Sequence, residues 1–190
     1  MQNLNGGNQA RIEDEELVRR AREDDPEAAS ELVSRYRPAL VRFCYRYFGH
    51  VEESEDVAQD VLGAITADGR WPEGNFRAWV YRLARNRCLN LVKRRQDGWI
   101  GAGSILGDSH LPSPHTGPRS ASLRKERNEG LRRHLASLTP NQREILVLRY
   151  FEDLSRRQIA EVLELSESVV KSRLFEAMRQ LQRIMKDTQA

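Results

Sequence analysis

Apolar side chains recur along most of this chain at the spacing of a helix. From Ala29 to Tyr47 they return every three or four residues, as one face of a helix does. The same period appears over residues 52–67, and again from Phe76 onward. No segment shows a convincing strand-like alternation of apolar and polar residues. The pattern therefore predicts an all-α fold.

Local signals mark where these helices begin and end. Asp25, Pro26 and Glu27 together predict a helix start, because Asp caps the first turn, Pro suits it, and Glu favours the positive end of the helix dipole. Gly49 is a plausible end for this helix, and Asn75 can cap the helix that starts at Phe76. We expect Pro38, inside the first of these helices, to favour a kink.

The next two helices are each expected to have one buried face and one polar face. On the helix over residues 52–67, the buried face comprises Val57, Ala58, Val61, Leu62, Ala64 and Ile65. The opposite stripe comprises Asp56, Gln59, Asp60 and Gly63. The following helix directs Phe76, Trp79, Val80, Leu83 and Ala84 toward a core. Its other side carries Arg82, Arg85, Asn86 and Lys93.

Residues 97–122 interrupt the helical pattern. They are rich in Gly, Pro and Ser and have no period, which is typical of a flexible linker between domains. We therefore predict two small helical domains, over residues 14–96 and 123–188, joined by this linker.

The second domain carries three further helix starts. A first helix is suggested by Leu123, Leu131, Leu135 and Leu138. Capping boxes then begin at Thr139 and Ser155, and Ser166 can cap a longer helix. The buried seam of this longer helix is predicted to be Val170, Leu174, Ala177, Leu181 and Ile184. Two capped helices joined by a turn near Glu164 and Leu165 indicate a helix-turn-helix.

Charge changes the picture in one place. The net charge of the 190 residues is only +3, but the segment from Arg77 to Arg95 holds seven Arg and Lys residues and no Asp or Glu. A basic segment of this kind attracts polyanions such as nucleic acids. A solvated helix face that serves only solubility is the alternative reading.

Other classes of protein are disfavoured. Cys44 and Cys88 are far apart and lack metal-ligand spacing, and the four histidines form no ligand cluster, so no metal or cofactor is expected. Neither a nucleophile with its base nor a phosphate-binding Gly loop is apparent, so an enzyme is not expected. With no long apolar run and a polar start, we expect a cytoplasmic protein without membrane insertion.

The longer helix of the predicted helix-turn-helix has the features of a DNA-reading element. Opposite its buried seam lie Ser168, Val169, Ser172, Phe175, Glu176 and Arg179. Lys171 and Arg173 flank this face, where they can reach phosphates. By spacing alone, an ordinary helical hairpin remains open.

Four segments resemble one known family. LTPNQREILVLRYFEDLSRRQIAEVLELSESVVKSRLFEAMRQLQ is similar to region four of the extracytoplasmic-function (ECF) type of RNA polymerase sigma factor. RYRPALVRFCYRY, EDVAQDVL and FRAWVYRLARNRCLNLVKRR, in that order, resemble the helices of sigma region two. The resemblance covers about residues 17–95 and 131–186. It implies a transcription-initiation subunit that binds core RNA polymerase and directs promoter recognition, DNA melting and initiation.

The resemblance also implies roles for residues. Asp56, Gln59 and Asp60 match the element that docks on polymerase. The minus-ten promoter element would be read and melted by Trp71, Arg82, Arg85, Asn86, Lys93 and Arg94. Trp79 and Tyr81 interleave with these basic residues, which suits single-strand binding, although core packing is favoured for Trp79. The minus-thirty-five element would be read by Ser168, Val169, Lys171, Ser172, Arg173, Phe175 and Glu176.

Several positions depart from the family pattern. Glu164 stands where a turn Gly is usual, so the turn must avoid positive φ or tolerate strain. Ser168 and Val169 stand where Gly-Thr is frequent, Glu176 replaces a residue that is often basic, and Asn90 stands where many members carry Asp.

The implied partners are core RNA polymerase and promoter DNA, and an anti-sigma factor is a further candidate, because many members of the family are held inactive by one. Two other classes stay open. One is a free-standing helix-turn-helix transcription regulator, and the other is an interaction protein built from helical hairpins.

Overall fold

The computed structural model describes residues 6–69, 71–98, 134–135 and 137–187. Every regular element within these residues is a helix, which confirms the all-α prediction. The chain divides into two compact units, which are described separately. None of the described helices is both long enough and apolar enough to cross a membrane. The predicted linker beyond residue 98, and Leu123 and Leu131, lie outside the described residues.

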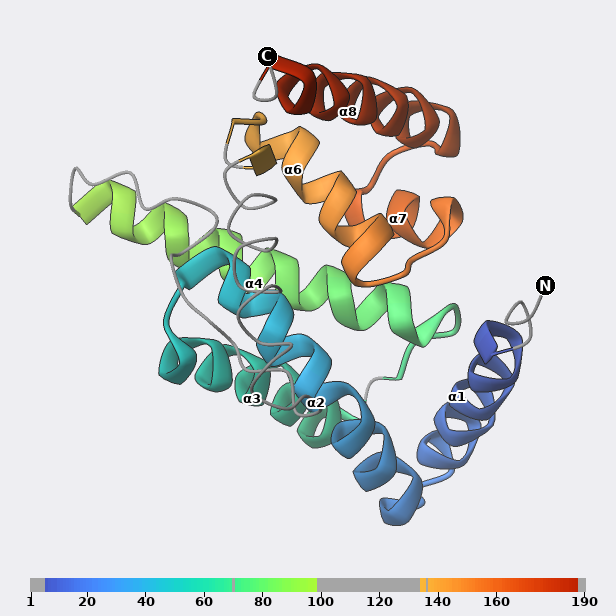
Figure 1. The fold of residues 1–190 in the computed structure, drawn as a ribbon. Coiled ribbons are helices and arrows are strands. Elements are labelled where there is room, and N and C mark those ends of the chain that lie inside the picture. The colour runs from blue at the N-terminus through green and yellow to red at the C-terminus, as the bar shows by residue number, and fades with distance from the viewer. Residues whose placement is uncertain (1–5, 70, 99–133, 136, 188–190) are drawn as a thin grey trace, which may run out of the picture. The chain divides into compact units, whose positions relative to one another are not determined.

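Four helices form the first unit (Figure 1). They are α1 (Gly6–Arg22), α2 (Pro26–Phe48), α3 (Val51–Asp68) and α4 (Phe76–Gly98). The end of α2, from Arg46 on, belongs to the second unit. The second unit contains α6 (Pro140–Leu146), the π-helix η1 (Val147–Phe151), α7 (Arg156–Leu163) and α8 (Glu167–Asp187).

The core of the first unit is built where α2 meets α4. Tyr36 packs edge-on against Phe76 with ring centroids 5.0 Å apart, and Phe43 packs edge-on against Tyr81 at 5.2 Å. Edge-to-face pairs of this kind add about 0.5–1.5 kcal/mol beyond the burial of their area. Tyr81 is only 1% exposed, so the prediction that it interleaves with the basic residues for strand binding was wrong. Its position on α4 faces α2 rather than solvent.

The buried face of α3 is confirmed at five of its six predicted positions. Val57, Ala58, Val61, Leu62 and Ile65 are all buried, and α3 packs against α4. Ala64 is exposed. It lies at the edge of the buried face of α3. Exposing its single methyl group to solvent costs little free energy.

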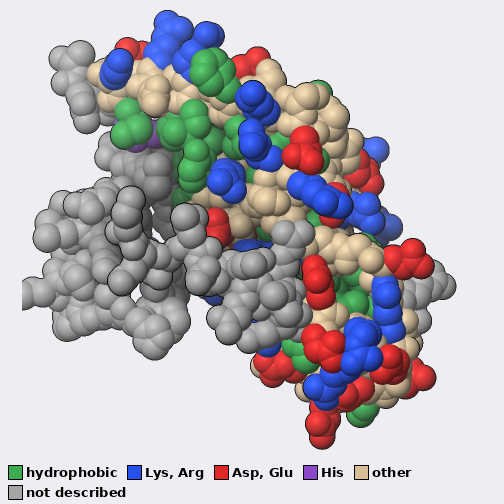
Figure 2. Space-filling view, turned by 90° about the vertical axis from the view of Figure 1, so that its right-hand side faces the viewer, with side chains coloured by type: hydrophobic (Ala, Val, Ile, Leu, Met, Phe, Trp, Pro, Cys, Tyr) green, Lys and Arg blue, Asp and Glu red, His purple; other side chains and the backbone are tan. Residues whose placement is uncertain are grey.

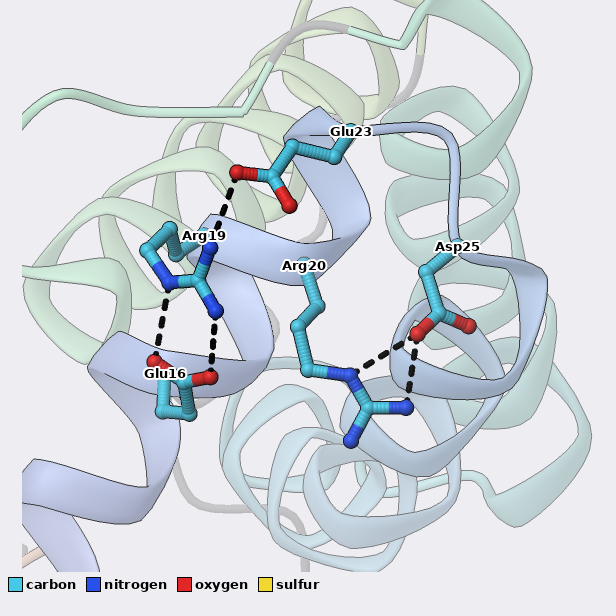
Figure 3. A network of polar contacts seen from close by, with 5 residues as sticks. All are labelled: Glu16, Arg19, Arg20, Glu23 and Asp25. Carbon is cyan, nitrogen blue, oxygen red and sulfur yellow. Dashed lines mark hydrogen bonds and ion pairs between the residues drawn. The ribbon is translucent and has the colours of Figure 1, made fainter.

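Asp25 joins α1 to α2 and caps the second helix, as predicted. Its Oδ1 accepts hydrogen bonds from the backbone N–H groups of Glu27 at 2.9 Å and Ala28 at 3.2 Å. Its Oδ2 lies 2.6 Å from Arg20 Nη2 (Figure 3). These contacts, first of all the hydrogen bond from Arg20, hold the pKa of Asp25 below its ordinary value.

A second contact between α1 and α2 centres on Asp14. Its carboxylate accepts a hydrogen bond from the Tyr36 hydroxyl and lies 2.7 Å from Arg35 Nη1. Burial, and then the hydrogen bond to Asp14, raise the pKa of Tyr36. The phenol therefore stays protonated and keeps donating to Asp14.

In the second unit, both predicted capping boxes form. The Thr139 and Ser155 side chains accept from the backbone N–H groups of Gln142 and Gln158, and both Gln side chains reach back to the cap. Arg143 is nearly buried and donates to the carbonyls of Leu135 at 2.9 Å and Leu138 at 3.1 Å. The helix start is thus fixed to the segment that precedes it.

The helix that begins at Pro140 widens into a π-helix, which the sequence pattern did not predict. Glu152 N–H donates to the carbonyl of Val147 at 3.1 Å, five residues back. The wider turn shifts the faces of the helix. Phe151, at the end of the wider turn, is 47% exposed, whereas Ile145 and Leu148 are fully buried.

Candidate nucleic-acid interface

One face of α3 presents a polar stripe to solvent. Asp56, Gln59 and Asp60 are all exposed, and their spacing of three and four residues places them in one row. Val57 and Val61 are buried on the other side of the helix, which fixes its rotation. We call these three residues the α3 acidic stripe. Their outward orientation matches the sequence prediction.

The α3 acidic stripe makes an ion pair with α4. Arg87 Nη2 lies 2.7 Å from Asp60 Oδ2, and both side chains are substantially exposed, at 44% and 57%. Sequence reasoning counted Arg87 only among the basic residues of the segment. The partners are 27 positions apart, so no local sequence signal indicates this contact. The structure thus joins the acidic and basic surfaces at one point.

The outward face of α4 is basic and polar. Asn86, Lys93 and Arg94 are exposed, and Arg82 and Arg85 are half-buried. Arg82, Asn86 and Lys93 are separated by four and seven residues, so they share one row along the helix. We call the five residues the α4 basic face. It offers guanidinium, ammonium and amide donors to a phosphate backbone or a base edge.

Two tryptophans lie near the N-terminal end of α4. Trp71 and Trp79 are both half-buried, and their rings lie 5.9 Å and 6.0 Å from the ring of Phe76. The Arg22 guanidinium donates to the carbonyl of Pro72, which ties the loop that carries Trp71 to α1. Trp71 is therefore held against Phe76 rather than standing free, while each indole keeps some exposed surface for stacking.

In the second unit, α7 and α8 form the predicted helix-turn-helix. Ser166 caps α8 by accepting from the backbone N–H of Val169 at 3.4 Å. Val162 on α7 and Val170 on α8 are fully buried, as is Ala177. The turn uses positive φ at Glu164, with φ 56° and ψ 45°. The chain therefore tolerates the strained conformation that glycine would adopt freely.

The rest of α8 projects its polar side chains outward. Seven residues make up what we call the α8 recognition face, all of them exposed: Ser168, Val169, Lys171, Ser172, Arg173, Phe175 and Glu176. Phe175 is 68% exposed. The Ser168 hydroxyl lies 2.9 Å from that of Ser166 and so takes part in the helix cap. Figure 2 shows Lys and Arg side chains gathered with hydrophobic ones at its top, over α8.

Two family models match the chain. The model for Sigma-70 region 2 matches residues 32–98, and the model for Sigma-70, region 4 matches residues 129–181. The first match contains the α3 acidic stripe and the α4 basic face, and the second contains the helix-turn-helix. Each of the surfaces described above therefore falls inside a matched region.

Named relatives agree with these matches. RNA polymerase sigma factor NccH of Alcaligenes xylosoxydans xylosoxydans is 31% identical over 181 residues, which cover 93% of this chain and 96% of that protein. RNA polymerase sigma-H factor of Pseudomonas aeruginosa is 30% identical, with 87% and 90% covered. ECF RNA polymerase sigma factor SigW of Bacillus subtilis is 23% identical, with 90% and 95% covered.

Solved structures share the fold. CnrH in complex with the cytosolic domain of CnrY matches with a TM-score of 0.64 and 25% identity, over 92% of this chain and 98% of that one. The sigma factor RpoE of Bartonella quintana, solved with the anti-sigma factor NepR, has a TM-score of 0.63 and 21% identity, over 83% and 96%. The region 2 match precedes the region 4 match along the chain, the named relatives are sigma factors, and the helices have the fold of solved sigma factors. This chain therefore belongs to the RNA polymerase sigma factors of the ECF type.

Proposed function

We propose that this sigma factor binds core RNA polymerase through the α3 acidic stripe and reads its promoter with the α4 basic face and the α8 recognition face. The observation that carries the proposal is the arrangement within the first unit. An acidic row and a basic row lie on neighbouring packed helices, so one small unit offers a protein-docking surface and a nucleic-acid surface together.

The α3 acidic stripe suits polymerase docking for electrostatic reasons. Asp56 and Asp60 are exposed on a helix whose other side is buried, so a partner can approach without unfolding the unit. Complementary charge on the partner would speed and orient the encounter. The exposed ion pair between Asp60 and Arg87 is not a barrier, since such pairs contribute only about 0–1 kcal/mol.

The α4 basic face suits the minus-ten element. Opening a duplex costs stacking energy, so the protein needs cations for the backbone and platforms for unstacked bases. Arg82, Arg85, Lys93 and Arg94 provide the cations, and Asn86 provides a neutral polar contact. The exposed parts of the two indoles near the N-terminal end of α4 provide stacking surface.

The α8 recognition face suits the minus-thirty-five element. A recognition helix places its first turns in the major groove. Ser172 lies near the centre of the exposed face, and Lys171 and Arg173 flank it within reach of phosphates. In this assignment the protein carries residues 14–96 and 123–188 as separate DNA-reading domains. The linker raises the effective concentration of the second contact once the first has formed.

An anti-sigma factor is a proposed further partner. The RpoE structure that shares this fold contains an anti-sigma factor, and the CnrH structure contains the cytosolic domain of CnrY. We further propose that this protein works in the bacterial cytoplasm, where RNA polymerase and its DNA are found, and that it carries no catalytic step of its own.

The deciding experiment mixes the purified protein with sigma-free bacterial core polymerase. We expect co-elution on size exclusion, followed by run-off transcripts with discrete start sites from a genomic fragment library. A free-standing regulator would instead bind specific duplex DNA tightly without polymerase. Failure to co-elute, together with such tight binding, would overturn the proposal.

A further inference from the structure

The rotation of α8 is fixed by its buried side, and this decides which side chains enter a groove. Val170 and Ala177 are fully buried, and Leu181 is 9% exposed. Ser166 caps the helix through the backbone N–H of Val169. The helix therefore cannot turn Val169 inward without removing Val170 from the core. The α8 recognition face therefore presents a fixed series of side chains to any DNA that binds it.

Val169 is an apolar side chain in the first turn of this series. It is 38% exposed, although the neighbouring Ser168 and Ser172 are polar. A valine here cannot hydrogen-bond a base edge. In the major groove, the one apolar feature of the bases is the C5-methyl group of thymine, and small apolar side chains contact it.

Glu176 lies two helical turns further along the same row. It is exposed and makes no ion pair with any described residue. An ionised carboxylate only accepts hydrogen bonds, so it needs an exocyclic amino group, which cytosine and adenine offer in the major groove. Guanine presents two acceptors there and would repel it. In a DNA-reading helix, an exposed carboxylate at this position would lower general affinity for DNA and raise selectivity.

We infer that Val169 and Glu176 set the base preference of the α8 recognition face: Val169 contacts a thymine methyl group, and Glu176 accepts from the amino group of cytosine or adenine and excludes guanine. The inference rests on the proposed reading of the minus-thirty-five element by α8. Seven residues of helix rise about 10 Å. The two selected bases therefore lie within roughly three base-pair steps of each other.

The test is binding selection with the reconstituted holoenzyme, on promoter DNA whose minus-thirty-five element is randomised. The wild-type protein is expected to select a thymine at one position of the element. At a second position, within a few base-pair steps, it should select cytosine or adenine, and guanine should be depleted there. Replacing that thymine by deoxyuracil removes only the methyl group, and should weaken wild-type binding roughly fourfold. Val169→Ser should bind the two DNAs equally.

Glu176→Arg should move the second position to guanine, because Arg donates to both guanine acceptors. Glu167→Gln is the matched control, since it removes an exposed carboxylate from the same helix at a point off the α8 recognition face. It should leave the selected bases unchanged. Thermal unfolding of each variant, followed by circular dichroism, reports whether the second unit, which contains α8, is folded.

Two outcomes of this experiment distinguish failure of the proposed function from failure of the base preference. If the wild-type protein forms no holoenzyme, the proposed function and the inference are both overturned. If the holoenzyme selects a promoter but treats thymine and deoxyuracil alike, or if Glu176→Arg selects the same bases as the wild type, only the base-preference inference is overturned.

Discussion

Arg87 on α4 donates to the carboxylate of Asp60 on α3, with 2.7 Å between Nη2 and Oδ2. The pair links the α3 acidic stripe, proposed to dock on polymerase, to α4, the helix proposed to read the minus-ten element. Any change at Asp60 therefore removes a contact inside the protein as well as a charge on its surface. Mutational tests of the α3 acidic stripe have to separate these two effects.

The combined variant Asp56→Lys and Asp60→Lys should bind core polymerase roughly tenfold more weakly, because it reverses the charge of the α3 acidic stripe. Fluorescence titration of labelled protein with core polymerase measures this. Arg87→Gln breaks the same ion pair without touching the stripe, so it is the control and should bind normally. Its free energy of unfolding should change by no more than about 0.5 kcal/mol. An undiminished affinity in the double variant would refute the docking assignment.

Replacing Arg85 and Asn86 by Ala should impair promoter opening more than it impairs polymerase binding. Both residues lie on the α4 basic face, and neither belongs to the α3 acidic stripe. Permanganate reactivity of unpaired thymines in the promoter measures opening, and co-elution measures binding. Arg19→Ala, an exposed arginine on α1, serves as the control and should leave both unchanged. Equal loss of opening and binding would mean that these residues are structural.

Glu164→Gly should stabilise the second unit, because glycine adopts φ 56° without the clash that a Cβ creates. We expect a gain of about 0.5–1 kcal/mol, or a rise of a few degrees in the Tm of this unit. Thermal unfolding followed by circular dichroism measures it. Glu164→Ala retains a Cβ and should bring no comparable gain. Equal gains in stability in the two variants would show that the Glu164 side chain beyond its Cβ, rather than the positive-φ backbone, destabilises the wild-type protein.

Asp25 should make the stability of the first unit depend on pH. Its folded pKa is held low by Arg20 and by backbone N–H groups, whereas in the unfolded chain it is about 4. The stabilisation is therefore present above that unfolded value and is lost as the pH falls through the folded pKa. Asp25→Asn keeps a capping oxygen but loses the charge.

The wild type should therefore exceed Asp25→Asn in Tm near pH 7, and the difference should vanish in acid. Asp25→Ala, which removes the cap as well, should be less stable than Asp25→Asn at both pH values. A constant difference between wild type and Asp25→Asn across this range would contradict the ionic role of Asp25.

Much of the fold was predictable because its signals are local. The caps at Asp25, Thr139 and Ser155 each act within one helical turn, so the residues that make them are neighbours in sequence. The outward placement of the α3 acidic stripe follows in the same way from helical period. Resemblance to a family then supplied the roles that spacing alone left open.

What the sequence by itself determined, then, is the set of helices, their polar and apolar faces, and the order of two family regions. Only the tertiary structure decided that Tyr81 is buried against Phe43, that Asp60 meets Arg87, and that Glu164 adopts positive φ. The physical reason is that helical period places a residue on its own helix within a turn, whereas these outcomes depend on how whole helices pack against one another.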